Sequence, residues 1–253
     1  MYEHELAFAL GMAERAAGLA MAVFRGDVRV SVKADETPVT QADTEIEAMI
    51  RAQLAAAFPD DAVLGEEQGG DPDVEGRIWV VDPIDGTANF ARGIPVWATL
   101  IALQVGGEPV LGVVSAPALG ERYQAVRGGG AWCNGGPIAV SEIADPAASQ
   151  LLYPGIGPWL REPRNERVLG VLATARRTRG FGDFWGHMLV ARGSAEAMLE
   201  PELALWDFAA LVPIVEEAGG RVTTLEGAPP RHGGSVLTSN GVLHDDLVAR
   251  LRD

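Results

Sequence analysis

Two aspartates follow a short apolar run in the first half of the chain. Residues 78–81 are β-branched and aromatic, a pattern typical of a buried strand, and Asp82 comes directly after them with Asp85 close behind. The proline between the two acids fixes φ, and the glycine after them permits a tight turn, so both carboxylates and the Ile84 carbonyl can face one point. Mg²⁺ prefers such oxygen ligands. The stretch therefore predicts a magnesium site, because an ordinary Asp-Pro turn explains the proline and the glycine but not the acids described next.

Three more acids lie where strands are predicted to end or helices to begin. Residues 62–64 have a strand pattern that ends just before Glu66. If this strand neighbours the one before Asp82, both acids emerge at the same sheet edge and can share a cation that relieves their repulsion. Asp43 and Asp207 each lie in the first turn of a predicted helix, where the helix dipole alone favours an acid. From the sequence, these two therefore have a structural explanation beside the functional one.

Composition narrows the class of protein. The chain has 253 residues, enough for one large domain or two small ones, and 47% hydrophobic residues are ample for a core. The net charge of −15 opposes binding to nucleic acid or to an anionic membrane. Cys133 is the single cysteine, which predicts a reducing compartment. Acids at the N-terminus argue against a signal peptide, and no apolar run approaches about 18 residues, so we expect a cytoplasmic protein without a membrane partner.

Hydrophobic periodicity predicts alternating helices and strands along the chain. The predicted helices cover residues 6–24, 40–59, 164–173, 184–192 and 206–220, with a last helix from about residue 243. The predicted strands cover residues 28–32, 62–64, 78–81, 99–105, 110–115, 123–126, 138–140, 151–157 with a turn, 195–199, 221–225 and 235–238. Those between residues 97 and 140 are expected to form an antiparallel meander.

A shift in composition just past the middle of the chain predicts two subdomains. Residues 1–145 are expected to carry most metal ligands, and residues 146–253 to complete the active site. Two glycine-rich segments, 128–130 and 134–136, could be mistaken for phosphate cradles, but hairpin turns explain them better. Lys33, in a polar loop, could contact a phosphate, although most surface lysines do not.

Several short stretches carry a specific set of motifs. They are Gly65-Glu66-Glu67, Asp82-Pro83-Ile84-Asp85-Gly86-Thr87 with Asn89-Phe90, Trp206-Asp207, and Glu216-Glu217-Ala218-Gly219-Gly220, with Pro38-Val39-Thr40 and Asp43 upstream. Together these residues resemble the inositol-monophosphatase-like phosphatases. The resemblance spans nearly the whole chain, and the motifs are specific as a set although each is modest alone. Ala88 stands where the family frequently has threonine, and we attach no functional consequence to it.

The resemblance implies an α/β fold, a layered α/β/α/β/α sugar-phosphatase architecture with two mixed or antiparallel sheets. It also implies Mg²⁺ dependence and hydrolysis of a small phosphomonoester, and we expect a homodimer. Glu66, Asp82 and the Ile84 carbonyl would hold one Mg²⁺, and Asp82, Asp85 and Asp207 a second. This assignment agrees with the chemistry, because two cations can neutralise a phosphate dianion, activate a water and stabilise the leaving oxygen.

The same resemblance implies the catalytic and substrate-binding residues. The expected catalytic residues are Asp43, Thr87 and Glu66. Of these, Asp43 and Thr87 would position and deprotonate the attacking water. The expected substrate-binding residues are Ile84, Asp85, Gly86, Thr87, Gly182, Asp183, Glu200 and Asp207. A Ser/His/Asp hydrolase is disfavoured because the chain has no Gly-x-Ser-x-Gly elbow, and nucleotide binding because it has no Gly-x-x-x-x-Gly-Lys-Ser/Thr loop.

Within the family, residues 177–187 with Glu200-Pro201 and 205–207 look most like the histidinol-phosphatase branch. Histidinol phosphate carries an ammonium group, whereas inositol phosphate presents neutral hydroxyls, and carboxylates at Asp183 and Glu200 suit a cation. The alternatives are that Asp183 caps a helix and that Glu200 is an ordinary strand-end acid. Inositol monophosphatase activity and a catalytically silent binding relative are the alternative functions.

Overall fold

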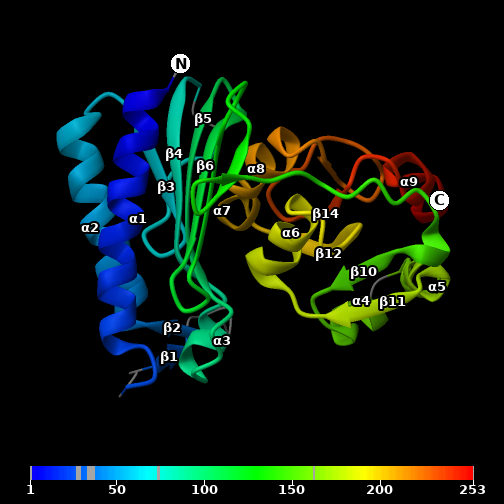
Figure 1. The fold of residues 1–253 in the computed structure, drawn as a ribbon. Coiled ribbons are helices and arrows are strands. Elements are labelled where there is room, and N and C mark those ends of the chain that lie inside the picture. Colours follow the sequence, from blue (N-terminus) through cyan, green and yellow to red (C-terminus); the bar gives the residue numbers. More distant parts are fainter. Residues whose placement is uncertain (1, 27–29, 33–37, 73–74, 162, 253) are drawn as a thin grey trace.

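Five alternating layers of helix and sheet make up the computed structural model of this chain, which describes residues 2–26, 30–32, 38–72, 75–161 and 163–252 (Figure 1). The helices are α1 Glu3–Val23, α2 Gln41–Ala57, α3 Thr87–Ala91, α4 Ile156–Arg161, α5 Asn165–Thr174, α6 Asp183–Ala191, α7 Leu205–Phe208, α8 Leu211–Glu217 and α9 His244–Leu251, with a 3₁₀ turn at Pro146–Ala148. The strands are β1 Val30–Val32, β2 Pro38–Thr40, β3 Ala62–Gly65, β4 Arg77–Asp85, β5 Ala98–Val105, β6 Glu108–Ala116, β7 Glu121–Val126, β8 Ala131–Cys133, β9 Gly136–Pro137, β10 Gln150–Tyr153, β11 Arg177–Gly180, β12 Ala197–Leu203, β13 Arg221–Thr223 and β14 Gly234–Ser239.

Both large sheets are mixed. The seven-stranded sheet runs β3-β4-β5-β6-β7-β8-β9, and only its β3–β4 pair is parallel among the described strands. The five-stranded sheet runs β11-β10-β12-β14-β13, with β10 parallel to both of its neighbours. The predicted α/β fold with two mixed sheets is therefore confirmed, and residues 62–64 and 78–81 do lie side by side in parallel strands.

Three helical layers cover the sheets (Figure 1). One face of the seven-stranded sheet packs against α1 and α2 through a core that includes Trp79 and Trp97, and the other packs against α6 and α8. The outer face of the five-stranded sheet packs against α4, α5 and α9. The sheets thus face each other across α6, α7 and α8, so residues from both can reach one site.

Helix α1 is the one helix among the described residues that could cross a membrane by length and composition. Its buried residues include Ala9, Ala13, Ala16 and Ala20, whose three- and four-residue spacing places them on one face against the sheet. Small side chains there let the helix approach closely. A core helix of this kind passes the same test, so the evidence for a membrane span is weak.

Several elements differ from the sequence-based expectations. Strand β4 does not end before Asp82 but continues through Asp85 with an irregular register between the two, because β5 pairs with both residues. The predicted strand 138–140 is irregular, and the short strands β8 and β9 lie before it. The predicted helix 206–220 is divided into α7 and α8, because Pro213 has no N–H to continue the hydrogen-bond ladder.

Some expectations concern residues outside the described parts of the chain. Lys33 and most of its polar loop lie there, as do residues 28–29 of the predicted strand 28–32, whose remainder forms β1. The division into residues 1–145 and 146–253 stays a prediction. Strands β3–β9 come from the first part and β10–β14 from the second, while α8 of the second part packs on the first sheet.

Candidate active site

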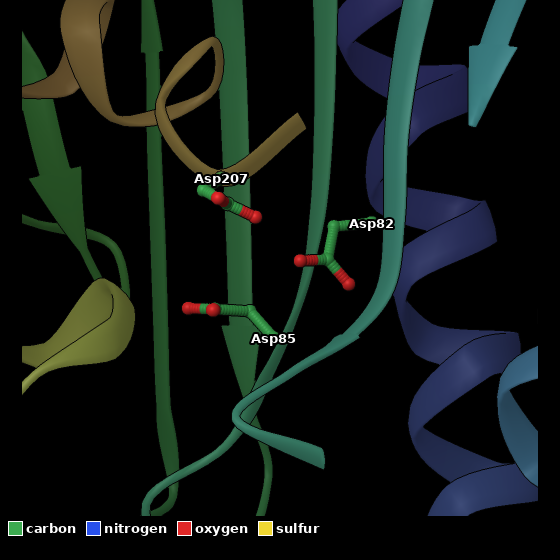
Figure 2. A group of neighbouring side chains, drawn as sticks. All are labelled: Asp82, Asp85 and Asp207. Carbon is green, nitrogen blue, oxygen red and sulfur yellow. The ribbon is translucent and has the colours of Figure 1, made fainter. Parts of the chain in front are cut away.

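Three aspartates converge beside the irregular end of β4. Asp82 and Asp85 come from that strand, and Asp207 comes from the first turn of α7, which approaches from the opposite side (Figure 2). Each offers a carboxylate oxygen, and these oxygens all lie within 4.8 Å of one another. Asp82 is 1% exposed and Asp85 8%. Three acids so close together form a donor set suited to a divalent cation.

The electrostatics of this triad call for a cation. Burial raises the pKa of Asp82 well above its ordinary value, and the negative charges of Glu66, Asp85 and Asp207 raise it further. Burial likewise raises the pKa of Asp85, with Asp183 and Asp207 adding to the effect. Asp82 Oδ1 is buried and has no hydrogen-bond partner among the described residues. An oxygen-binding metal ion would satisfy this atom and relieve the repulsion, so the residues fit such a group.

Glu66 reaches the same cavity from the parallel strand. Its backbone N–H donates to the Val81 carbonyl at 3.2 Å, and Glu66 lines the cavity with Asp85 and Asp207. Because parallel strands bring their carboxyl ends to one sheet edge, the sequence-based argument placed Glu66 correctly beside the triad. The structure thus brings together four of the acids selected from the sequence.

A buried glutamate that the sequence analysis missed holds the loop carrying Glu66. Glu47 is fully buried and accepts hydrogen bonds from the Glu67 N–H at 2.7 Å and the Gln68 N–H at 3.0 Å. Arg51 Nε lies 2.7 Å from its Oε1. A Cβ at Gly65 would clash with the same carboxylate, so a larger residue there would displace Glu47 from these hydrogen bonds. A sequence signal for this role was available, because Glu47 and Arg51 stand four residues apart on α2 and can pair on one face of the helix.

Asp43 and Thr87 are joined across the site although they are far apart in sequence. Thr87 Oγ1 lies 3.2 Å from Asp43 Oδ1 and 2.9 Å from the Ile84 carbonyl oxygen. Asp43 also accepts from the Thr40 N–H at 2.9 Å, and its side chain completes a capping box on α2. Burial raises the pKa of Asp43. The carboxylate therefore has a structural role at the helix start and a partner in the site.

Gly86 allows the chain to turn from β4 into α3. Its φ is 84°, in the left-handed region, and a Cβ there would lie 2.9 Å from the Val96 carbonyl oxygen. Both observations require glycine. Thr87 begins α3 directly afterwards, so backbone N–H groups of its first turn are placed beside the acidic cluster.

A cavity of about 360 Å³ extends from the triad to a second group of acids. Asp183, the first residue of α6, has a φ of 58° and accepts a 2.7 Å hydrogen bond from Asn89 Nδ2. Burial raises the pKa of Asp183 to about 6. Glu200 is 3% exposed within β12, and burial raises its pKa well above the ordinary value. Gly182 lies beside them, since a Cβ there would be 3.3 Å from Glu200 Oε1.

His187 also lines this cavity, although it was not among the site residues predicted from the sequence. It lies one turn after Asp183 on α6, so the four-residue spacing could have placed both side chains on the same helix face. Trp206 also lines the cavity, and its ring lies 5.3 Å from that of His232.

Comparison with known proteins agrees with this geometry. The family model described as the inositol monophosphatase family matches residues 1–253. A histidinol-phosphatase of Mycobacterium tuberculosis is 45% identical over 257 residues, covering 99% of each chain. Inositol-1-monophosphatase SuhB of the same species is 37% identical over 242 residues, covering 90% of this chain and 82% of the relative. A solved inositol monophosphatase from Zymomonas mobilis superposes with a TM-score of 0.88 at 33% identity, covering 99% of this chain and 98% of that one. The chain belongs to the inositol monophosphatase family.

Proposed function

We propose that this protein is a Mg²⁺-dependent phosphatase that hydrolyses histidinol phosphate to histidinol and phosphate. The observation that carries the proposal is a cavity lined by Asp85 and Asp207 of the aspartate triad and by two further acids, Asp183 and Glu200. The 45% identity to a histidinol-phosphatase over nearly the full chain supports the same substrate.

The residues at the triad fit Mg²⁺. Asp82, Asp85, Asp207, Glu66 and the Ile84 carbonyl would hold the metal. When bound, the metal supplies positive charge that offsets the phosphate dianion and lowers the pKa of a coordinated water. No covalent nucleophile is then required.

The chain itself orients the attacking water and takes its proton. In our proposal, Thr87 Oγ1 holds the water, and the Asp43 carboxylate, 3.2 Å from that hydroxyl, receives the proton. Hydrogen bonds from Thr40 to Asp43 keep this carboxylate in one orientation. The phosphate is received at the turn formed by Gly86 and Thr87, where N–H groups at a helix start favour an anion.

Two further acids in the cavity lining, Asp183 and Glu200, would select the rest of the substrate. Burial raises the pKa of both carboxyl groups, so a positive charge beside them favours their ionised forms. A substrate ammonium supplies the missing positive charge, which hydroxyl groups of inositol phosphate cannot do. A charged hydrogen bond of this kind contributes roughly 1.5–3 kcal/mol, or about 10- to 150-fold in kcat/KM.

Phosphate release from two substrates tests the proposal. We expect the purified protein to hydrolyse histidinol phosphate in Mg²⁺ but not in EDTA, and to prefer it over inositol 1-phosphate by at least roughly tenfold. Glu200→Gln should narrow that preference, since it weakens the binding of the cationic substrate more than that of the neutral one. Glu202→Gln, at an exposed position of the same strand, is the matched control.

Two results would contradict the proposal in different ways. Equal or better turnover of inositol 1-phosphate would assign the chain to inositol monophosphatase activity and leave the metal chemistry intact. Failure to release phosphate from either substrate in Mg²⁺ would favour the catalytically silent alternative. The homodimer and the cytoplasmic location stay predictions. Light scattering of the purified protein gives its mass in solution and so tests the homodimer.

A further inference from the structure

His187 lines the proposed substrate cavity and has a buried ring nitrogen without a hydrogen-bond partner in the described parts of the chain. The residue is 1% exposed, and its Nδ1 lies 2.7 Å from Thr238 Oγ1 on β14. Its other ring nitrogen, Nε2, is buried and has no hydrogen-bond partner among the described residues. A buried polar atom without a partner is costly, so it requires an explanation.

The fold contains a second buried histidine for comparison. His244 is fully buried, and both of its ring nitrogens have partners: Nδ1 lies 2.7 Å from Ser239 Oγ and Nε2 lies 3.0 Å from Thr223 Oγ1. His244 is therefore satisfied within the protein. His187 differs in that it lines a cavity and lacks one partner.

The surroundings of His187 define what its Nε2 can bind. Burial lowers the pKa of His187 to about 3, so the ring is neutral at physiological pH and has one N–H and one acceptor nitrogen. The 2.7 Å contact with Thr238 allows either tautomer, and we take the one in which Nδ1–H donates to the Thr238 hydroxyl and Nε2 is the acceptor. Glu200 lines the same cavity, and its Oε1 is likewise buried without a partner among the described residues. In that tautomer two residues of the cavity lining each have an acceptor without a partner, which calls for a ligand with N–H or O–H donors.

We infer that His187 is a substrate-binding residue whose Nε2 accepts a hydrogen bond from the polar, non-phosphate end of the substrate, next to Glu200. This inference rests on the proposed phosphatase function and deepens it. The nitrogen-bearing part of histidinol phosphate supplies such donors through its ammonium and imidazole groups. His187 adds an acceptor to this wall without adding negative charge to a cavity already rich in acids.

Two substitutions separate substrate binding from packing. His187→Asn keeps a polar atom near the position of Nδ1 for Thr238 and removes Nε2, whereas His187→Gln returns an amide near the position of Nε2. Both are assayed in Mg²⁺ with histidinol phosphate, inositol 1-phosphate and propyl phosphate, whose tail has no hydrogen-bonding group. His244→Asn, at the satisfied buried histidine, is the matched control.

We expect His187→Asn to lower kcat/KM for histidinol phosphate roughly tenfold, mainly through KM, and to change it less than about twofold for propyl phosphate. His187→Gln should recover part of the loss, and His244→Asn should leave the ratio between substrates unchanged. Equal losses on histidinol phosphate and propyl phosphate would overturn the inference, because a packing role affects both.

The design also separates this inference from the proposed function. If the wild type hydrolyses inositol 1-phosphate but not histidinol phosphate, the proposed substrate is wrong. The comparison of inositol 1-phosphate with propyl phosphate then decides the role of His187 alone. If His187→Asn does not fold, judged by circular dichroism, the same comparison is made with His187→Gln. A larger loss of kcat/KM on the polar substrate than on propyl phosphate then supports the inference, and an equal loss on both contradicts it.

Discussion

Replacing Asp82 with asparagine should stabilise the metal-free protein while abolishing its activity. The Asp82, Asp85 and Asp207 carboxylate oxygens lie within 4.8 Å of one another, and two unit charges at that separation repel by about 3.5 kcal/mol at an effective dielectric constant of 20. The metal-free protein avoids part of this repulsion by binding a proton on one of the carboxylates. At pH 8, holding one aspartate protonated costs about 5.6 kcal/mol relative to a pKa of about 3.9, which sets the upper limit of the gain.

Within that limit we expect Asp82→Asn to stabilise the EDTA-treated protein by about 2–4 kcal/mol at pH 8, or roughly 4–16 °C in Tm. The sign follows from linkage. The folded pKa of Asp82 is raised, so the folded state binds more protons, and wild-type stability falls as pH rises from the unfolded pKa through the folded one. The gain should therefore be small near pH 4, where the folded aspartate is protonated and an unfolded aspartate, with a pKa of about 3.9, is about half protonated.

Thermal melts at the two pH values, each with EDTA or with Mg²⁺, provide the measurement. Mg²⁺ should raise the wild-type Tm more than that of the variant, because the variant loses a ligand charge. Asp246→Asn removes an exposed acid whose Oδ2 lies 2.8 Å from Arg250 Nε, and it controls for net charge. The reasoning is refuted if metal-free Asp82→Asn melts at or below the wild type at pH 8, or if it retains activity within about tenfold of it.

The remaining predictions concern the residues around the metal site. Thr87→Ala should lower kcat by roughly 10² to 10⁴ and leave the calorimetric Mg²⁺ affinity nearly unchanged, because the Thr87 hydroxyl contacts Asp43 and the Ile84 carbonyl. A large loss of Mg²⁺ affinity would instead make Thr87 a metal ligand. Glu47→Gln should raise the Mg²⁺ concentration for half-maximal activity roughly 10- to 100-fold, because it loosens the loop after β3, while Glu45→Gln at an exposed position of the same helix should not. A fall in kcat at saturating Mg²⁺, without a change in the Mg²⁺ concentration for half-maximal activity, would contradict this role of Glu47.

The sequence located the acids because each lies at a local signal. Asp82 follows an apolar strand, Glu66 follows a second one, and Asp43 and Asp207 occupy first turns of helices. These signals depend on residues close in the chain. Their convergence needed only the rule that parallel strands end at one sheet edge, together with the family resemblance.

Other features depend on partners distant in the chain and were missed. The irregular register between Asp82 and Asp85 is set by pairing with β5, which the β4 sequence does not contain. Strand β11 carries exposed arginines in place of an alternating apolar pattern, and β8 has three residues, too few for periodicity. His187 is an isolated residue on a predicted helix, and its role depends on where β12 and β14 place the cavity wall.

The cavity is lined by residues from β4 and β12, which belong to different sheets, and from α6 and α7, which lie between the sheets. Figure 1 shows these helices between the two sheets. In our proposal the phosphate is held largely by one continuous stretch, residues 82–87, whereas His187 on α6 and Glu200 on β12 come at least 100 residues later. A change of side chain at His187 or Glu200 would then alter which alcohol leaves without changing the residues that hold its phosphate. This separation offers a physical reason why proteins named for histidinol phosphate and for inositol phosphate share one architecture, and it makes the wall around Glu200 and His187 the place to redesign selectivity.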